Sequence, residues 1–288
     1  MKYLNKNFAI CCLACLALTG FSSCSDDDDN NTTTTLSAGD QYLQKVLEEN
    51  VDKTIHPTYA AMALAADSLY QQTQTIHEAT KTKSVTQAMV DEACNNWKSA
   101  RQRYEKSEAF LMGAAADYDI DPHIDTWPLD LATLYKTLSN DALIKSYDTD
   151  DKDANAQKAN SDLGQTVLGF HGIEFILFRD GQPRKANELN GYASYNKDGL
   201  DFTKFTGEYE MIFAEAVAGD LRNSIYRLEV CWNENAPKSH FDVLEALEWN
   251  TKMSNSDQSY GQNMKAAGQP GSLYRSVKTA CSAVLAGD

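Results

Sequence analysis

The sequence predicts an all-α protein. Through most of the chain after residue 50, apolar residues recur every three or four positions, which is the spacing of one face of an amphipathic helix. No segment alternates apolar and polar residues between hairpin turns, as a half-buried strand would. At 288 residues, the chain is long enough for one large domain or two smaller ones, each with its own core.

The first 23 residues are typical of a signal peptide. Lys2 and Lys6 precede a short apolar stretch, residues 8–20, which is too short to span a bilayer comfortably. The segment ends in Phe21-Ser22-Ser23-Cys24, which resembles a lipobox. We therefore expect a lipid anchor on Cys24, with an ordinary cleaved secretory peptide as the alternative.

Residues 24–38 form a predicted disordered tether that is polar and begins with four consecutive aspartates. An acidic run directly after the lipidated cysteine resembles the export signal of surface lipoproteins in some Gram-negative bacteria. The alternative is a solvated spacer. The expected location is the outer membrane, facing the cell surface, with a periplasm-facing anchor as the alternative.

Charge and cysteine content narrow the class of protein further. The net charge of −15 excludes nucleic acid as a partner, because phosphate neutralisation needs clustered Lys and Arg. Once the signal peptide is removed and Cys24 is lipidated, an odd number of cysteines is left, so no disulfide framework is implied. We expect these to be small buried residues: Cys94, Cys231 and Cys281.

The first half of the folded region contains three predicted helical stretches. A stripe over residues 51–76 is interrupted by Pro57, so we expect a kink there or two abutting helices. Ser84-x-x-Gln87 predicts a capping box that opens the second helix. A polar turn region is expected over residues 117–126, and Pro128 is expected to open the third helix.

The second half is built around a helix that is apolar on nearly every face, residues 163–178, which therefore belongs in the middle of the fold. A loop with a helix entry precedes it, and a surface excursion follows it. The remaining predicted segments are the loop at 148–160, the excursion at 191–201, a long stripe over 202–232, and helices at 241–253 and 273–285.

Two polar side chains, His171 and Glu174, are expected on the apolar face of this central helix. At positions i and i+3 they can converge on one ligand, and an imidazole nitrogen with a carboxylate oxygen is a reasonable half-site for iron or zinc. Gly169 and Gly172 would allow another backbone or a ligand to approach closely. The alternative is a hydrogen-bonded His–Glu pair that locks the core.

Two more acids are candidates. Glu108 lies in line with the apolar stripe of the second helix, with Arg101 seven residues before it, so it either pairs with that arginine or faces a site. Asp125 or Thr126 is expected to cap the helix that follows, with Trp127 in the core.

Several chemistries are excluded by missing motifs. The five histidines are scattered and form neither the zincin motif nor its inverted form. The sequence also has no phosphate-binding loop, no dinucleotide glycine fingerprint and no nucleophile elbow.

Three motifs, taken in order along the chain, resemble those of the imelysin family. They are Ser107-Glu108-Ala109-Phe110 with Gly113, then Ile124-Asp125-Thr126-Trp127-Pro128-Leu129-Asp130, then the GxHxxE signature Gly169-x-His171-x-x-Glu174. This resemblance, taken from Asp40 to about Leu285, implies two packed four-helix-bundle-like domains. We place them at residues 39–160 and 161–288, the second carrying the signature near the domain interface.

The resemblance favours His171, Glu174, Glu108 and Asp125 as metal- or ligand-binding residues, supported by Gly169, Gly172, Ser107, Trp127 and Arg101. Iron-regulated members imply a role in iron acquisition, so the first hypothesis is a binding protein for iron, another metal or a small iron-bearing ligand. Such a protein would serve uptake with an envelope partner. The family's peptidase label implies a second hypothesis, that the protein is a metallopeptidase, although the sequence contains no complete set of protease catalytic residues that we can assemble. The third is a non-catalytic structural or interaction module.

Overall fold

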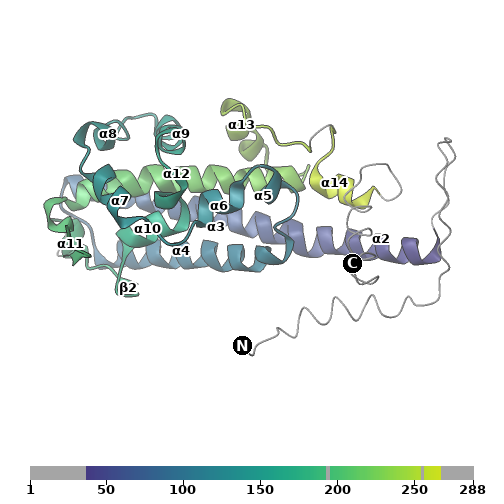
Figure 1. Ribbon diagram of the computed structural model, residues 1–288, viewed down its shortest axis with the longest axis horizontal. Coiled ribbons are helices and arrows are strands. Elements are labelled where there is room, and N and C mark those ends of the chain that lie inside the picture. Colours follow the sequence, from purple (N-terminus) through teal and green to yellow (C-terminus); the bar gives the residue numbers. More distant parts are fainter. Residues whose placement is uncertain (1–36, 193–194, 254–255, 267–288) are drawn as a thin grey trace. The chain divides into compact units, whose positions relative to one another are not determined.

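The computed structural model describes residues 37–192, 195–253 and 256–266. These residues are predominantly helical, which confirms the predicted class (Figure 1). The signal peptide, Cys24, the tether up to residue 36, the helix expected at 273–285 and Cys281 lie outside the described residues. No helix in the described part of the chain has the length and apolar character needed to cross a membrane.

The chain divides into two compact units. One comprises Met1–Val51 and Gln262–Asp288, and helix α2 (Ala38–Asn50) belongs to it. The other is Asp52–Gly261. The domain boundary predicted between residues 160 and 161 falls inside this second unit and stays a prediction.

The helices from residue 56 onward vary widely in length, and the two longest each span 26 residues. In chain order they are α3 (His56–Lys81), α4 (Gln87–Ser107), α5 (Ala114–Asp117), α6 (Ile120–Asp125), α7 (Leu131–Leu138), α8 (Asp141–Lys145), α9 (Lys152–Asp162), α10 (Gly169–Leu177), α11 (Ala186–Leu189), α12 (Gly207–Trp232), α13 (Lys238–Ala246) and α14 (Tyr260–Lys265).

Short elements of other kinds connect these helices. A π-helix, Val51–Ile55, lies between α2 and α3, and Pro57, which has no N–H to donate, lies in the first turn of α3 directly after it. The 3₁₀ turns are η2 (Glu108–Phe110), η3 (Gln165–Val167) and η4 (Phe202–Lys204). Two hairpins, which the sequence analysis did not predict, pair β1 (Phe178–Arg179) with β2 (Gln182–Pro183) and β3 (Asn196–Lys197) with β4 (Leu200–Asp201).

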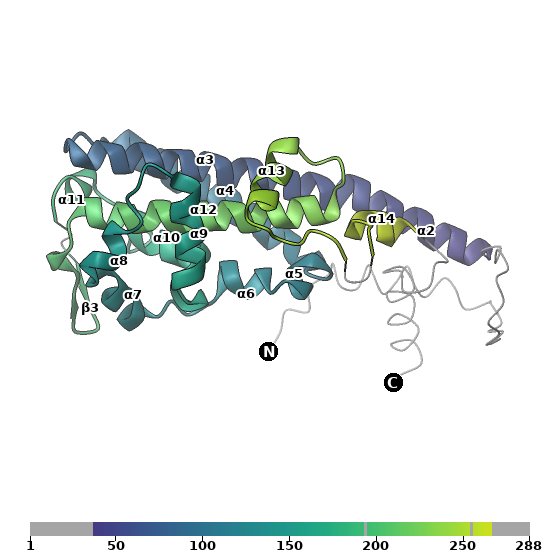
Figure 2. The same cartoon turned by 90° about the horizontal axis from the view of Figure 1, so that it is seen from above.

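Helix α12 forms the centre of the second unit. It packs against α3, which in turn packs against α4, and the shorter helices α5 to α9 lie on the side of α12 away from α3 (Figure 2). This arrangement buries α12 around nearly its whole circumference, including most of its charged residues. The long apolar stripe predicted over residues 202–232 is therefore a helix from Gly207 onward, with Thr206 as its N-cap.

The buried charges of α12 are all paired with side chains from other segments, as burial of a charge requires. Glu210 contacts two arginines, and Asp220 contacts a histidine and an amide. The paired atoms lie 2.5 Å apart for Arg184–Glu210, 3.3 Å for Arg179–Glu210, 2.5 Å for His77–Glu215, 3.0 Å for Lys152–Glu215, 2.8 Å for His123–Asp220 and 2.7 Å for His240–Glu229.

The start of α4 differs from the prediction. The N-cap is Thr86, not Ser84: its backbone is extended, and its hydroxyl accepts a hydrogen bond from the backbone N–H of Met89. Ser84 instead closes the preceding helix, because its N–H donates to the carbonyl oxygen of Ala79. The predicted capping box was therefore two residues out of register.

Three further boundaries were also wrong. The expected polar turn at 117–126 contains a short helix, α6, and Pro128 does not open the next helix, because Asp130 caps α7 three residues from Thr133. The predicted 163–178 helix is broken, since Leu163 and Gly164 have extended backbones and α10 begins only at Gly169.

The helix predicted over 241–253 also ends early. Helix α13 stops at Ala246 because Glu248 adopts a left-handed conformation (φ +57°), and the N–H of Trp249 then donates to the carbonyl oxygen of Leu244. The segment after Ala246 is consequently free to place Trp249 on the surface of α12, near Arg227.

Both described cysteines fit the expectation of small buried residues. Cys94 and Cys231 are free thiols with no exposed surface. Burial raises the pKa of each thiol to about 12, so neither is a thiolate near neutral pH.

Candidate functional site

The site around His171 depends on a close contact between two backbones. Gly169, the first residue of α10, has φ +65°, and a Cβ atom built on it would lie 2.1 Å from the carbonyl oxygen of Ile124 in α6. A Cβ on Gly172 would lie 2.2 Å from the carbonyl oxygen of Val167. Both glycines therefore permit close backbone approach, as predicted: Gly169 brings the start of α10 against α6, and Gly172 allows close contact with η3.

This contact places His171 between two carboxylates. Its Nε2 lies 3.1 Å from Oδ1 of Asp125, at the end of α6, and its Nδ1 lies 2.9 Å from Oε2 of Glu174, one turn further along α10. His171 and Asp125 are mostly buried, with side chains 13% and 16% exposed, whereas Glu174 is 40% exposed. Glu174, which we expected on the apolar face of the helix, is therefore only partly buried.

Arg101 of α4 completes the network around Asp125. One terminal nitrogen pairs with Oδ1 of Asp125, and the other lies 2.6 Å from Oε1 of Glu105. The guanidinium also lies over the ring of Phe170, 5.4 Å from its centroid. Asp125 thus shares one oxygen between an arginine and a histidine.

Trp127 lies on the surface of this site. Its side chain is 70% exposed, so the prediction that it belongs to the core was wrong. Its ring is tilted against the imidazole of His171 with centroids 4.7 Å apart. A large exposed aromatic side chain beside a charged network is a common feature of ligand-binding surfaces.

Glu108 does not pair with Arg101, which was one of its two expected roles, and the supporting residue Ser107 makes only a local contact. Glu108 begins the 3₁₀ turn η2 and is exposed, and Arg101 pairs with Glu105 and Asp125 instead. Ser107 is buried and donates to the carbonyl oxygen of Tyr104 at 2.7 Å, which is a local helix-end contact. Any part that either residue plays in binding stays a prediction.

The residue types at this site suit iron or zinc, but the geometry does not gather them around one ion. Nδ1 of His171 is engaged by Glu174, and Oδ1 of Asp125 is paired with Arg101, so these groups already have partners within the protein. Among the described residues, no three His, Cys, Asp or Glu side chains are arranged to hold an ion. The direct metal-ligand assignment stays a prediction.

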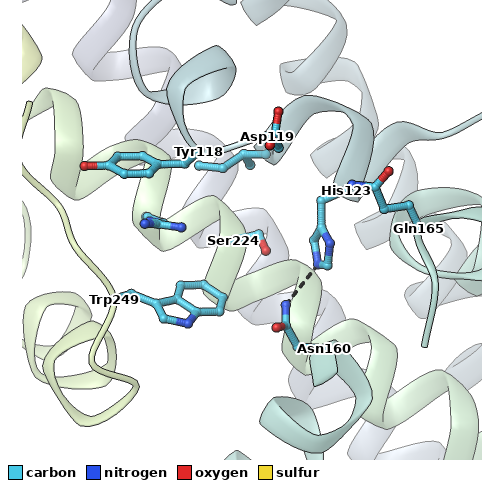
Figure 3. Close-up of a pocket in the computed structure, with 9 residues that line it drawn as sticks. Tyr118, Asp119, His123, Asn160, Gln165, Ser224 and Trp249 are labelled. Atoms are coloured by element: carbon cyan, nitrogen blue, oxygen red, sulfur yellow. Dashed lines mark hydrogen bonds between the residues drawn. The ribbon is translucent and has the colours of Figure 1, made fainter. Parts of the chain in front are cut away.

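A pocket lies elsewhere on the same unit, and no feature of the sequence predicted it. Its volume is about 270 Å³, and its walls come from α6, α9, η3, α12 and the segment after α13 (Figure 3). Tyr118 and Trp249 lie on one side of it, and His123, Asn160 and Gln165 lie on the other. No motif or periodicity connects these segments.

A buried acid of α12 holds His123 in place at the edge of this pocket. Asp220 accepts from Asn160 at 2.8 Å, and its other oxygen lies 2.8 Å from Nε2 of His123. Burial alone would lower the pKa of His123, but the hydrogen bond to Asp220 and its negative charge outweigh burial and raise it.

Together, the fold and the site define an all-helical protein with a histidine held between two carboxylates beneath an exposed tryptophan. The imelysin family model (Peptidase_M75) matches residues 55–277, well over half of the chain. The chain therefore belongs to the imelysin family.

Three individual proteins are similar to it. Iron-regulated protein A of Synechococcus elongatus is 32% identical over 133 residues, which cover 46% of this chain and 31% of that protein. The crystal structure of a protein designated an iron-regulated protein A precursor from Parabacteroides distasonis superposes with a TM-score of 0.57 at 21% identity. It covers 85% of this chain and 56% of the other. The crystal structure of an imelysin-like protein from Psychrobacter arcticum has a TM-score of 0.48 at 14% identity. It covers 82% of this chain and 60% of the other. The chain thus spans about a third to a little over half of these relatives.

Proposed function

We propose that this imelysin-family protein binds a small iron-bearing ligand at the site around His171, for uptake at the cell envelope. The name of the Synechococcus relative, iron-regulated protein A, supports an iron-related role. The contact that carries the proposal is the exposed ring of Trp127 lying against His171, which itself contacts Asp125.

A ligand that brings its own iron fits this surface better than a bare cation does. The guanidinium of Arg101 lies against Asp125 and repels a free metal ion approaching that carboxylate. Because the two terminal nitrogens of Arg101 already pair with Asp125 and Glu105, these carboxylates are occupied, and the ligand would supply the donor atoms of its iron itself. Trp127 offers a flat apolar face to the body of such a ligand.

The experiment is a retention assay on the purified full chain. The protein is incubated separately with haemin, ferric EDTA and ferrous ion under anaerobic conditions, and iron is measured after gel filtration. We expect one of the two chelates to be retained at one per chain, and ferrous ion to be retained far less. Because a charged hydrogen bond is worth about 1.5–3 kcal/mol, His171→Ala and Asp125→Asn should each weaken retention about tenfold or more.

The matched control is Asp141→Asn, which removes an exposed carboxylate from α8 and should leave retention unchanged. Retention that is equal in wild type, His171→Ala and Asp125→Asn would overturn the assignment. If both variants lower the melting temperature and no chelate is retained, the network is a structural lock instead of a binding site.

The envelope location rests on the sequence of the N-terminus. We propose that Cys24 carries a lipid and anchors the protein in the outer membrane, facing the surface, where it would pass its cargo to an uptake partner. Cell fractionation tests this: the protein should sediment with membranes, and Cys24→Ser should release it into the soluble fraction. Membrane association that is unchanged in Cys24→Ser would contradict the anchor.

A further inference from the structure

The pocket between α6, α9 and α12 contains an arginine without an acidic partner. The Nε of Arg227 donates to the carbonyl oxygen of Asn250 at 2.9 Å. In the described part of the chain, no carboxylate lies within ion-pair distance of its guanidinium, although the protein as a whole carries a net charge of −15. Among the described residues, its guanidinium is therefore available to pair with an anionic ligand.

Two aromatic rings hold this guanidinium in place. It lies 3.7 Å from the ring centroid of Tyr118 and 5.3 Å from that of Trp249. Rings that cover the faces of a guanidinium leave its edge available, and that edge presents N–H groups in the fork geometry that suits a carboxylate. Partial burial lowers the pKa of Arg227, so its charge is poorly solvated and an anion would stabilise it.

The opposite side of the pocket supplies neutral hydrogen-bonding groups. Asn160 and Gln165 face Trp249 across it, with Ser224 between them (Figure 3). The buried charge of Asp220 is already satisfied by His123 and Asn160. Such a wall suits hydroxyl groups, which can both donate and accept hydrogen bonds.

The charge balance limits the ligand to one negative charge. Among the described residues that line the pocket, Arg227 is a cation without an acidic partner, and Asp119, which also lines it, would repel a second anionic group. The volume of about 270 Å³ is slightly below the range of drug-sized sites, so the ligand is small.

We propose that this pocket binds a small polyhydroxylated monocarboxylate, that is, a sugar acid. Its carboxylate pairs with the edge of the Arg227 guanidinium, and its hydroxyl groups bond to Asn160, Gln165 and Ser224. This site is separate from the one around His171, and the inference does not depend on the proposed iron-related function.

The experiment is calorimetric titration of the purified full chain with three probes of graded chemistry. D-glucuronate carries both recognised features, D-glucose has the hydroxyl groups without the carboxylate, and inorganic phosphate has the charge without the hydroxyl groups. We expect glucuronate to bind with one site per chain, and glucose and phosphate to bind at least about tenfold more weakly, since each loses a charged pair or several hydrogen bonds.

Two variants and one control assign the site. Arg227→Lys keeps the charge but removes the fork and should weaken glucuronate about tenfold. Gln165→Ala alters an exposed side chain of a 3₁₀ turn, so it should fold normally and weaken binding by a smaller factor. Lys106→Gln removes one exposed positive charge from α4, outside the pocket, and should bind as the wild type does.

Several outcomes would overturn the proposal. One is the absence of glucuronate binding to the folded wild-type chain. Another is equal affinity for glucuronate and phosphate, which would show that only charge is recognised. The third is unchanged affinity in both Arg227→Lys and Gln165→Ala.

Discussion

His123 and Asp125 lie two residues apart on α6 and serve two different sites. His123 lies 2.8 Å from Asp220 of α12, whereas Asp125 lies 3.1 Å from His171 of α10. Residues at i and i+2 point to opposite sides of a helix, so this short helix separates the His171 site from the Arg227 pocket. Displacing α6 should therefore disturb both sites together.

The contact between Gly169 and Ile124 gives the first prediction. Gly169→Ala should destabilise the protein by more than the roughly 1–2 kcal/mol of a left-handed alanine, because its Cβ would also meet the Ile124 carbonyl. Gly181 has φ +72° and open space around it, so Gly181→Ala should lower the free energy of unfolding only by the cost of the left-handed alanine backbone. Gly164→Ala, with a negative φ and open space, should be nearly neutral. Urea denaturation measures all three, and equal losses at Gly169 and Gly181 would refute the close contact.

The buried charges of α12 give the second prediction. Glu210→Gln should lower the free energy of unfolding by about 3–5 kcal/mol, because Arg179 would lose its carboxylate and the buried Arg184 would keep only Glu188. Asp141→Asn removes an exposed carboxylate from an i,i+4 pair and should cost about 0.5 kcal/mol or less. Denaturant unfolding of both variants checks this. A small loss at Glu210 would show that the arginines find water or another acceptor.

Thiol reactivity provides a third test. Burial raises the pKa of Cys94 and Cys231 to about 12, and both thiols lack exposed surface. Iodoacetamide at pH 8 should therefore leave both unmodified in the native protein and label both in denaturant, as read by peptide mass spectrometry. Labelling of either peptide in the native state, at the rate seen in denaturant, would contradict its burial.

A pH-dependent cap gives the fourth prediction. Hydrogen bonds from the backbone and then the side chain of Thr133 lower the pKa of Asp130, the N-cap of α7, below its usual 3.8. Because the pKa of Asp130 is lower in the folded than in the unfolded protein, the stabilisation that its carboxylate gives the fold is complete above pH 3.8. This stabilisation is lost as the pH falls through the pKa of Asp130 in the folded protein. Asp130→Asn should thus be less stable than wild type at pH 6, and the gap should narrow toward pH 3. Thermal melts at both pH values measure the gap, and a constant difference would rule out titration of Asp130.

The sequence predicted the helical class and the roles of two glycines, because both depend on local chemistry. Helical periodicity identifies buried faces wherever a segment packs on one side, and a glycine within a helix signals a close approach. Gly169 and Gly172 fulfil that expectation through contacts that no other residue type would allow.

The features of the His171 site and of the pocket that were not predicted depend on contacts between segments far apart in the sequence. Arg101 pairs with Glu105, four residues on, because Glu108 lies two helical turns away. Trp127 was assigned to the core from its hydrophobicity alone, yet it covers His171 from the solvent side. The pocket brings Tyr118, Arg227 and Trp249 together from three segments that share no pattern, so only the tertiary fold reveals it.

Fluorescence of Trp127 tests the central claim most directly. The full chain is titrated with whichever of haemin and ferric EDTA it retains, and quenching of tryptophan emission is followed. We expect most of the saturable quenching to disappear in Trp127→Phe and to persist in Trp249→Phe, which alters the other pocket. Quenching that is equal in wild type and Trp127→Phe would show that the iron-bearing ligand does not bind at the His171 site.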